Sequence, residues 1–166
     1  DVITININDN PSVSDLNTIA GKTAGVVTAT LAATSLSALG SLSTAATDDI
    51  TITVNDANTT PVNATDLSAL GNKTAGTVTV SNAVAITGNH DQVTAALVTS
   101  GSKVEVGAAT VTINDAGGTA ITATELSAIG GATTGTVTVS NAVAITGDHD
   151  QVTAALVTSG SKVEVG

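Results

Sequence analysis

The sequence predicts an α/β solenoid, in which two short parallel strands and one short helix recur in stacked coils. Three observations lead to this fold class: an aliphatic composition without aromatic residues, a tandem repeat, and a strand, strand, helix pattern within each repeat. A repeat of this kind cannot bury its apolar side alone, so a stacked neighbour must cover it.

The composition restricts how the interior can be filled. The 166 residues include no Phe, Tyr, Trp, Cys, Met or Arg, so Val, Ile, Leu and Ala must form the core. Small branched side chains reach native packing density by regular interdigitation, which near-identical stacked layers provide. A hydrophobic content of 42% and a mean hydropathy of +0.37 argue against a disordered chain.

Charge and cysteine content exclude several classes of partner. Four Lys against fourteen Asp and Glu give a net charge of −10, which disfavours nucleic acid and anionic membranes as partners. No apolar run approaches the roughly 20 residues that span a bilayer, so we expect no membrane insertion. Without cysteine the chain has neither a disulfide framework nor a thiolate metal site, which suits an exported protein.

The repeat is the strongest signal, and it defines a single array over residues 1–166. Residues 49–107 match residues 108–166 at an offset of 59 without a gap, and 77–107 differ from 136–166 only where Asn89 becomes Asp148. Residues 1–48 are a diverged, shorter copy, in which Ile3–Asp9 matches Ile50–Asp56.

The first half of each long repeat reads as two strands and a helix. Thr77–Val80 and Val84–Ile86 alternate apolar and polar residues as strands do, with a bend at Ser81 and Asn82 between them. Val93, Ala96 and Leu97 then have the spacing of a buried helical stripe. We place a helix over Asp91–Leu97, ended by Gly101.

The second half repeats the pattern, which gives a coil of about 29 or 30 residues and between five and six coils in all. Its strands are Lys103–Val106 and Val111–Ile113, and its helix is Thr124–Ile129, ended by Gly130. The residues predicted to point inward are Val78, Val80, Val84, Ile86, Val93, Leu97, Val104, Val106, Val111, Ile113, Leu126 and Ile129.

A tandem β-sandwich of the immunoglobulin or cadherin type is the alternative fold. Ile3–Pro11 and Ile52–Asp56 resemble the last strand and calcium-binding linker of such domains. Those modules are about 100 residues long, however, whereas this period is 59 and contains helical patterns.

One segment resembles a known group of repeats. Asp15–Thr30 has the form D-L-N-T-I-x-G-K-T-x-G-x-V-T-A-T, and Asp66–Val80 and Glu125–Val139 are looser instances. This pattern resembles repeats of very large extracellular and cell-surface proteins of marine bacteria, especially picocyanobacteria. The resemblance implies roles in surface layers, adhesion, motility or extracellular fibres, and it brings no catalytic residues. Lys73 is replaced by Ala132 in the third repeat, so no role of this lysine carries over to it.

The two histidines are the first candidates for catalysis or metal binding. His90-Asp91 and His149-Asp150 are equivalent, and two coils would separate them by about 10 Å, whereas the ligands of one zinc ion lie within about 4 Å. A hydrolytic triad would also need a positioned hydroxyl and an oxyanion hole. We interpret each pair as a His and a capping Asp at a helix start, and we predict no enzyme, no catalytic residue and no organic cofactor.

Three aspartates could contribute to calcium sites. Asp9, Asp56 and Asp115 each follow an Asn at the end of a predicted strand, and carboxylate and amide oxygens suit this hard cation. The alternative is an Asx turn, in which the side chain binds its own backbone two residues on. We favour the turn, because neither a glycine-rich nonapeptide nor an EF-hand loop is present.

Recurrent Thr-x-Thr segments raise the alternative of an ice-binding solenoid with a flat threonine face. If Val78 and Val80 point inward, Thr77 and Thr79 point outward. The outward pair on the next coil would be Lys103 and Glu105, and charges on alternate coils interrupt a flat face. These charges instead discourage sideways pairing of sheets.

Together these patterns predict a structural, extracellular or cell-surface protein that is a segment of a surface layer, fibre or filament. Its expected partner is itself, through end-to-end stacking into a homopolymer or filament, because an open heterologous contact does not close. We expect no nucleic acid and no small-molecule substrate. A calcium-dependent adhesin module is the alternative function, and an ice-binding solenoid is the second.

Overall fold

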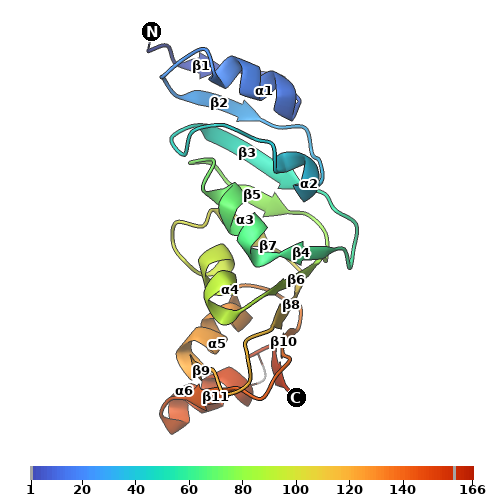
Figure 1. Ribbon diagram of the computed structural model, residues 1–166, viewed down its shortest axis with the longest axis vertical. Coiled ribbons are helices and arrows are strands. Elements are labelled where there is room, and N and C mark those ends of the chain that lie inside the picture. The colour runs from blue at the N-terminus through green and yellow to red at the C-terminus, as the bar shows by residue number, and fades with distance from the viewer. Residues whose placement is uncertain (1, 159) are drawn as a thin grey trace.

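A computed structural model describes residues 2–158 and 160–166. It has a mixed α/β fold with twelve short strands and six helices, arranged along one long axis with the chain ends at opposite ends (Figure 1). We refer to residues 1–48, 49–107 and 108–166 as units 1, 2 and 3. None of the described helices has the length and apolarity that a bilayer-spanning segment requires.

Unit 1 is the simplest of the three. Its elements are β1 (Ile5–Asn6), α1 (Val13–Ala20), β2 (Val27–Thr30) and α2 (Leu36–Leu39).

Units 2 and 3 have the same seven elements in the same order. Unit 2 has β3 (Asp49–Val54), β4 (Pro61–Asn63), α3 (Ala64–Gly71), β5 (Val78–Val80), β6 (Ala85–Gly88), α4 (His90–Leu97) and β7 (Val104–Val106). Unit 3 has β8 (Thr110–Ile113), β9 (Ala120–Thr122), α5 (Ala123–Gly131), β10 (Val137–Val139), β11 (Ala144–Thr146), α6 (His149–Leu156) and β12 (Val163–Val165).

The strands form three sheets, and every described strand pair is parallel. Two sheets have five strands, in the orders β1-β2-β3-β5-β7 and β12-β10-β8-β6-β4, and the third pairs β11 with β9. Immunoglobulin-like sandwiches are antiparallel. The sandwich alternative is therefore wrong.

The spacing between paired strands is shorter than the predicted coil of 29 or 30 residues. Ile52 pairs with Val78 and Val78 with Val104, so partners are 26 residues apart, and the pairs of β4 with β6 are 24 apart. The prediction was wrong because it divided the 59-residue repeat into equal halves. The 59-residue repeat is longer than two of these 26-residue spacings, and the additional strand β7 lies at the end of the unit.

As a result, the first strands of units 2 and 3 lie in different five-stranded sheets. In unit 2, β3, β5 and β7 share one sheet, whereas β4 and β6 begin the other. Strand β8 then pairs with β6 rather than with β7, at Ile86 and Val111. The opening strand of unit 3 thus continues the second sheet of unit 2. The sequence analysis missed β4 and β9, which are three residues long and directly precede helices.

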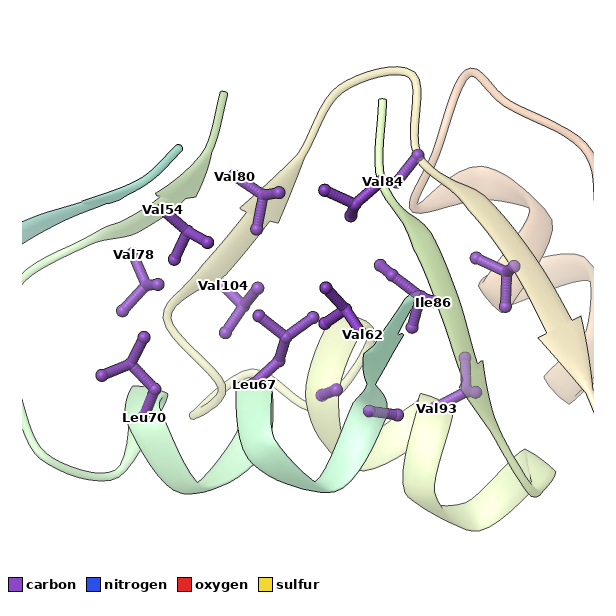
Figure 2. Packing of buried hydrophobic residues seen from close by; sticks show 14 of the residues in the cluster. Val54, Val62, Leu67, Leu70, Val78, Val80, Val84, Ile86, Val93 and Val104 are labelled. Atoms are coloured by element: carbon purple, nitrogen blue, oxygen red, sulfur yellow. The ribbon is translucent and has the colours of Figure 1, made fainter. Parts of the chain in front are cut away.

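A single aliphatic cluster fills the space between the sheets and the helices. Figure 2 shows Val54, Val78 and Val80 facing Leu67 and Leu70 of α3. Ten of the twelve residues predicted to point inward are buried. The other two, Leu97 and Val106, are partly buried and pack against the cluster.

The predicted helices are present, but the capping residues differ from the prediction. Asn89, not Asp91, is the N-cap of α4, and its side chain and that of Gln92 form a reciprocal capping box. Asp148 has the same role in α6, so Asp91 and Asp150 are first-turn acids rather than caps. The sequence could not separate these positions, since Asp is favoured both at the N-cap and in the first turn of a helix.

A Thr-x-Gly turn leads from a helix to the next strand in every unit. The hydroxyl of Thr74 accepts the N–H of Ile50 (2.8 Å) and donates to carbonyl oxygens of Asp48 and Ile50 (3.0 and 2.8 Å). A Cβ on Gly76 would lie 2.6 Å from the Ile50 oxygen, so only glycine fits. Thr23 accepts the N–H of Ile3 and donates to its carbonyl in the same way, whereas Thr133 donates to the carbonyl of Ala109. A Cβ on Gly25 or Gly135 would meet the same two carbonyl oxygens.

Replacing the buried hydroxyl of this turn will destabilise the protein. Thr74→Val keeps the shape of the side chain but leaves the Ile50 N–H without its partner, so we expect a loss of about 1–3 kcal/mol in free energy of unfolding. Thr79→Val, on the exposed side of β5, is the matched control and should change stability by less than about 0.5 kcal/mol. Equal effects in urea-induced unfolding would contradict this role of Thr74.

Candidate functional site at the unit junctions

The most distinctive polar contacts lie where one unit meets the next. Asn55 N–H donates to the carbonyl of Thr34 at the first junction, and Asn114 N–H donates to the carbonyl of Gly88 at the second, both at 3.0 Å. Both bonds continue the parallel pairing of strands across the junction. The two junctions are therefore built in the same register, although unit 1 is shorter.

The aspartate that follows each Asn binds a helix of the preceding unit. Asp56 Oδ2 accepts the N–H of Leu36, the first residue of α2, and Asp115 Oδ2 accepts that of His90, the first residue of α4, both at 2.7 Å. A carboxylate at a helix N-terminus satisfies a free N–H and interacts favourably with the helix dipole. Each Asn-Asp pair thus joins two units.

The second junction has an additional ionic contact. The Nδ1 atom of His90 lies 2.7 Å from Oδ1 of Asp115, and Nε2 lies 3.4 Å from Oδ1 of Asp91. The side chains of His90 and Asp115 are only 13% and 6% exposed. Both ring nitrogens therefore face carboxylates, which is the geometry of an ion pair rather than of a base that activates a nucleophile.

The surroundings of His90 favour its protonated form. Burial by itself lowers the pKa of the imidazole. The hydrogen bond to Asp115 and its negative charge raise it, as do the nearby carboxylates of Asp91 and Glu125. These contributions together outweigh burial, so the pKa of His90 lies above its ordinary value of 6.5.

The second histidine has the same sequence context but different surroundings. His149 lies 2.8 Å from its neighbour Asp150, and both side chains are almost fully exposed, at 89% and 87%. The counterpart of Asp115 would come from a following unit. The two His-Asp pairs are equivalent in sequence, and the pairing of His90 with Asp115 could not be predicted because 25 residues separate them.

The predicted calcium ligands are not brought together. Asp56 and Asp115 each bind a different helix, and Asp9 is exposed near the start of unit 1. Among the described residues, no three His, Cys, Asp or Glu side chains are close enough to hold a metal ion. The favoured Asx turn does not describe Asp56 or Asp115, because these carboxylates bind the backbone of the preceding unit.

The threonine rows differ from the prediction that charges alternate with threonines, because Thr112 pairs with threonine on both sides, with Thr87 and with Thr138. Thr79 pairs with Glu105 in β7, and Thr138 pairs with Glu164 in β12. A carboxylate therefore ends each row, as expected for a surface that is not a flat threonine face.

Several junction residues were not found from the sequence. The buried carboxylate of Asp48 accepts the N–H groups of Val27 (2.9 Å) and Ala45 (2.8 Å), which ties the end of unit 1 to β2. Lys73 Nζ donates to the carbonyl of Gly40 just after α2 (3.0 Å), a contact that Ala132 cannot make in unit 3. Asp48 lies outside the repeated motif, and the motif that contains Lys73 does not indicate Gly40 as its partner.

The turn that contains each junction aspartate is also fixed from within its own unit. Ser81 Oγ donates to the Val54 carbonyl (3.0 Å) and Asn82 Nδ2 to the Asp56 carbonyl (2.8 Å). Ser140 and Asn141 bind Ile113 and Asp115 in the same way, at 3.0 and 2.7 Å. The Ser-Asn bend seen in the sequence therefore positions the Asp that crosses the junction.

No protein-family model, curated protein or solved structure matches the chain.

The ion pair at the second junction predicts a specific pH dependence of stability. Because the folded state raises the pKa of His90, this stabilisation is complete below pH 6.5 and is lost as pH rises through the folded pKa. The difference in melting temperature between the parent chain and His90→Gln should therefore shrink from pH 6 to pH 8.5. NMR titration in a His149→Gln background should give a His90 pKa above 6.5 that falls in Asp115→Asn. An unchanged pKa in Asp115→Asn would contradict the pairing.

Removal of calcium should leave the fold unaffected. The carboxylates of Asp56 and Asp115 already bind helix N–H groups, whereas calcium takes six to eight oxygen ligands. We expect the same melting temperature in chelator and in millimolar calcium. A calcium-dependent rise that Asp9→Asn or Asp56→Asn removes would instead support the calcium-dependent adhesin.

Proposed function

We propose that this chain is a segment of a structural protein at or beyond the cell surface, built as an α/β solenoid whose units stack end to end. The role is mechanical: the units form a spacer, coat or filament, and the chain has no catalytic centre.

The observation that carries the proposal is the repetition of one junction. Two junctions of different sequence use the same backbone pairing and the same carboxylate-to-helix contact, at equal distances. A contact that joins one unit to the next without closing on itself extends in one direction. This is the property required of a rod or fibre.

The surface also supports a mechanical role. The net charge of −10 keeps such a rod soluble, and Glu105 and Glu164 lie on exposed strand positions where they oppose lateral pairing of sheets. The resemblance to repeats of marine bacterial surface proteins, and the absence of cysteine, favour a place outside the cell. Filament growth by self-association belongs to this proposal.

An adhesin and an ice-binding solenoid are weaker alternatives. The adhesin would need calcium ligands that converge, and the aspartates predicted for it are engaged separately in junctions. Ice binding would need an unbroken threonine face, and the rows of Thr79 and Thr138 end on Glu105 and Glu164.

Shape and location test the proposal. Small-angle scattering on chains with one or two additional copies of residues 108–166 should give a maximum dimension that grows linearly with unit number at constant cross-section. An antibody to the chain should label extended structures on the surface of the source cells in electron micrographs. Compaction on adding units, or label confined to the cell interior, would refute it.

A further inference from the structure

The helices that meet at the two junctions differ in length. At the second junction they are α4 and α5, of eight and nine residues, whereas at the first they are α2 and α3, of four and eight (Figure 1). A helix of four residues rises about 6 Å, half the rise of a helix of eight. Helix α3 also buries four residues, whereas α2 buries only Leu39. The first junction therefore has the less complete helical layer, although it lies inside the chain with α1 before it and α4 after it.

Two hollows flank the short helix α2. One has a volume of about 320 Å³, lies between α2 and α3, and is lined by Leu36, Ala69 and Leu70 among others. The other, of about 500 Å³, lies between α1 and α2 and is lined by Val13 and Ala38 among others. Close packing normally fills the space between neighbouring helices. The short helix thus leaves room for α3 to move toward it or away from it.

Polar contacts hold the two ends of α2 to unit 2. Asp56 accepts the N–H of Leu36 at its start (2.7 Å), and Lys73 Nζ donates to the carbonyl of Gly40 just after its end (3.0 Å). Thr44 Oγ1 in turn donates to the carbonyl of Lys73 (2.7 Å). The lysine contact is exposed, and exposed contacts of long charged side chains restrain little. These contacts therefore guide a movement of α2 without filling the space beside it.

The opposite side of the first junction is continuous. Strands β2, β3 and β5 pair in succession, with Ala29 beside Ile50 and Ile52 beside Val78. Ile50, Ile52 and Val78 are fully buried. Local mobility is expected where buried apolar contacts are few, and stability where they are dense. A rod with a continuous sheet on one side and an interrupted helical layer on the other bends more easily at the interruption.

The second junction is held more firmly on its helical side. Asp115 accepts the N–H of His90 with one carboxylate oxygen and contacts the imidazole with the other, both at 2.7 Å. The two side chains are 6% and 13% exposed, and the carboxylate of Glu125 in α5 adds a favourable charge near the imidazole. At the first junction, Asp56 makes only the bond to the N–H of Leu36. Two bonds to one buried carboxylate fix the start of α4, whereas one bond leaves α2 free to tilt.

We propose that the first junction is a bending point, at which units 1 and 2 tilt relative to each other as the hollows beside α2 open and close. The second junction holds units 2 and 3 as one rigid body. Collective movements of packed elements of this kind occur in microseconds to milliseconds. The inference goes beyond the proposed function, since a straight rod would also serve as a spacer. A bending point lets a coat or fibre follow a curved surface while its sheet stays intact.

Distances between pairs of spin labels test the proposal on the full 166-residue chain, which contains no cysteine of its own. Ala38→Cys with Thr65→Cys places labels on α2 and α3, across the first junction. The matched pair, Ala95→Cys with Thr124→Cys, places them on α4 and α5, across the second. All four side chains are exposed, so the labels need not disturb the core. Electron paramagnetic resonance should give a distance distribution at least about twofold broader for the first pair than for the second.

Filling the hollow between α2 and α3 should remove the movement. Ser37 and Ala69 both line it and are exposed, so Ser37→Leu or Ala69→Leu adds an apolar side chain there without entering the core. Either change should narrow the distribution of the first label pair to about the width of the second, because new packing contacts restrain α2. Ser100→Leu, in the exposed turn after α4, is the control and should leave the width unchanged. Circular dichroism should show that all labelled and filled variants are folded.

The outcomes separate the bending point from the structural role. Equal widths for the two label pairs would overturn it, because both junctions would then be equally rigid. A first-pair width that neither Ser37→Leu nor Ala69→Leu reduces would overturn it as well. If small-angle scattering still shows particles that lengthen with added units, the structural role stands with a rod that does not bend at this point.

Discussion

The apolar residues of β3, β5 and β7 point into one interior, and each strand is completed only by its neighbour in the same parallel ladder, 26 residues away. Because the chain has no aromatic side chain, no single large residue shields the apolar side of a strand from water. The apolar residues of the neighbouring strand and helix must do so by close packing. Register is therefore strongly specified. A slip of one residue would turn Val78 and Val80 outward.

Polar groups at the corners enforce the same register. Thr74 and Ser81 bind backbone atoms of the neighbouring strand β3, 24 and 27 residues earlier in the chain. These polar contacts at the turns and the apolar contacts in the core therefore require the same strand register. The glycine of the Thr-x-Gly turn permits the close approach, because any Cβ there would meet a carbonyl oxygen. Core and corners thus stabilise each other, as expected for a chain in which local and global preferences agree.

Much of this fold could be predicted from the sequence, because periodicity reports burial directly. Alternation identified β5, β6, β7 and β8, and the i, i+3, i+4 spacing identified α4. The pass length could not be obtained in this way, since a repeat period counts residues between copies and not between stacked strands. The partners of His90 and Asp48 were also out of reach, because they depend on which segments lie side by side after folding.

A comparison of the two junctions shows which contacts both of them contain. Unit 1 lacks counterparts of β4, β6 and β7, and only an isolated bridge at Thr34 takes the place of β6. Its junction nevertheless keeps the same two contacts to backbone groups. The carboxylate binds the helix N–H, which Leu36 offers as well as His90 does. The contact of the His90 imidazole with Asp115 therefore adds to a junction whose shared contacts are all made to backbone groups. A junction of this kind requires little of the sequence beyond an Asn-Asp pair and a capped helix start, which is why the diverged unit 1 meets unit 2 through the same contacts by which unit 2 meets unit 3.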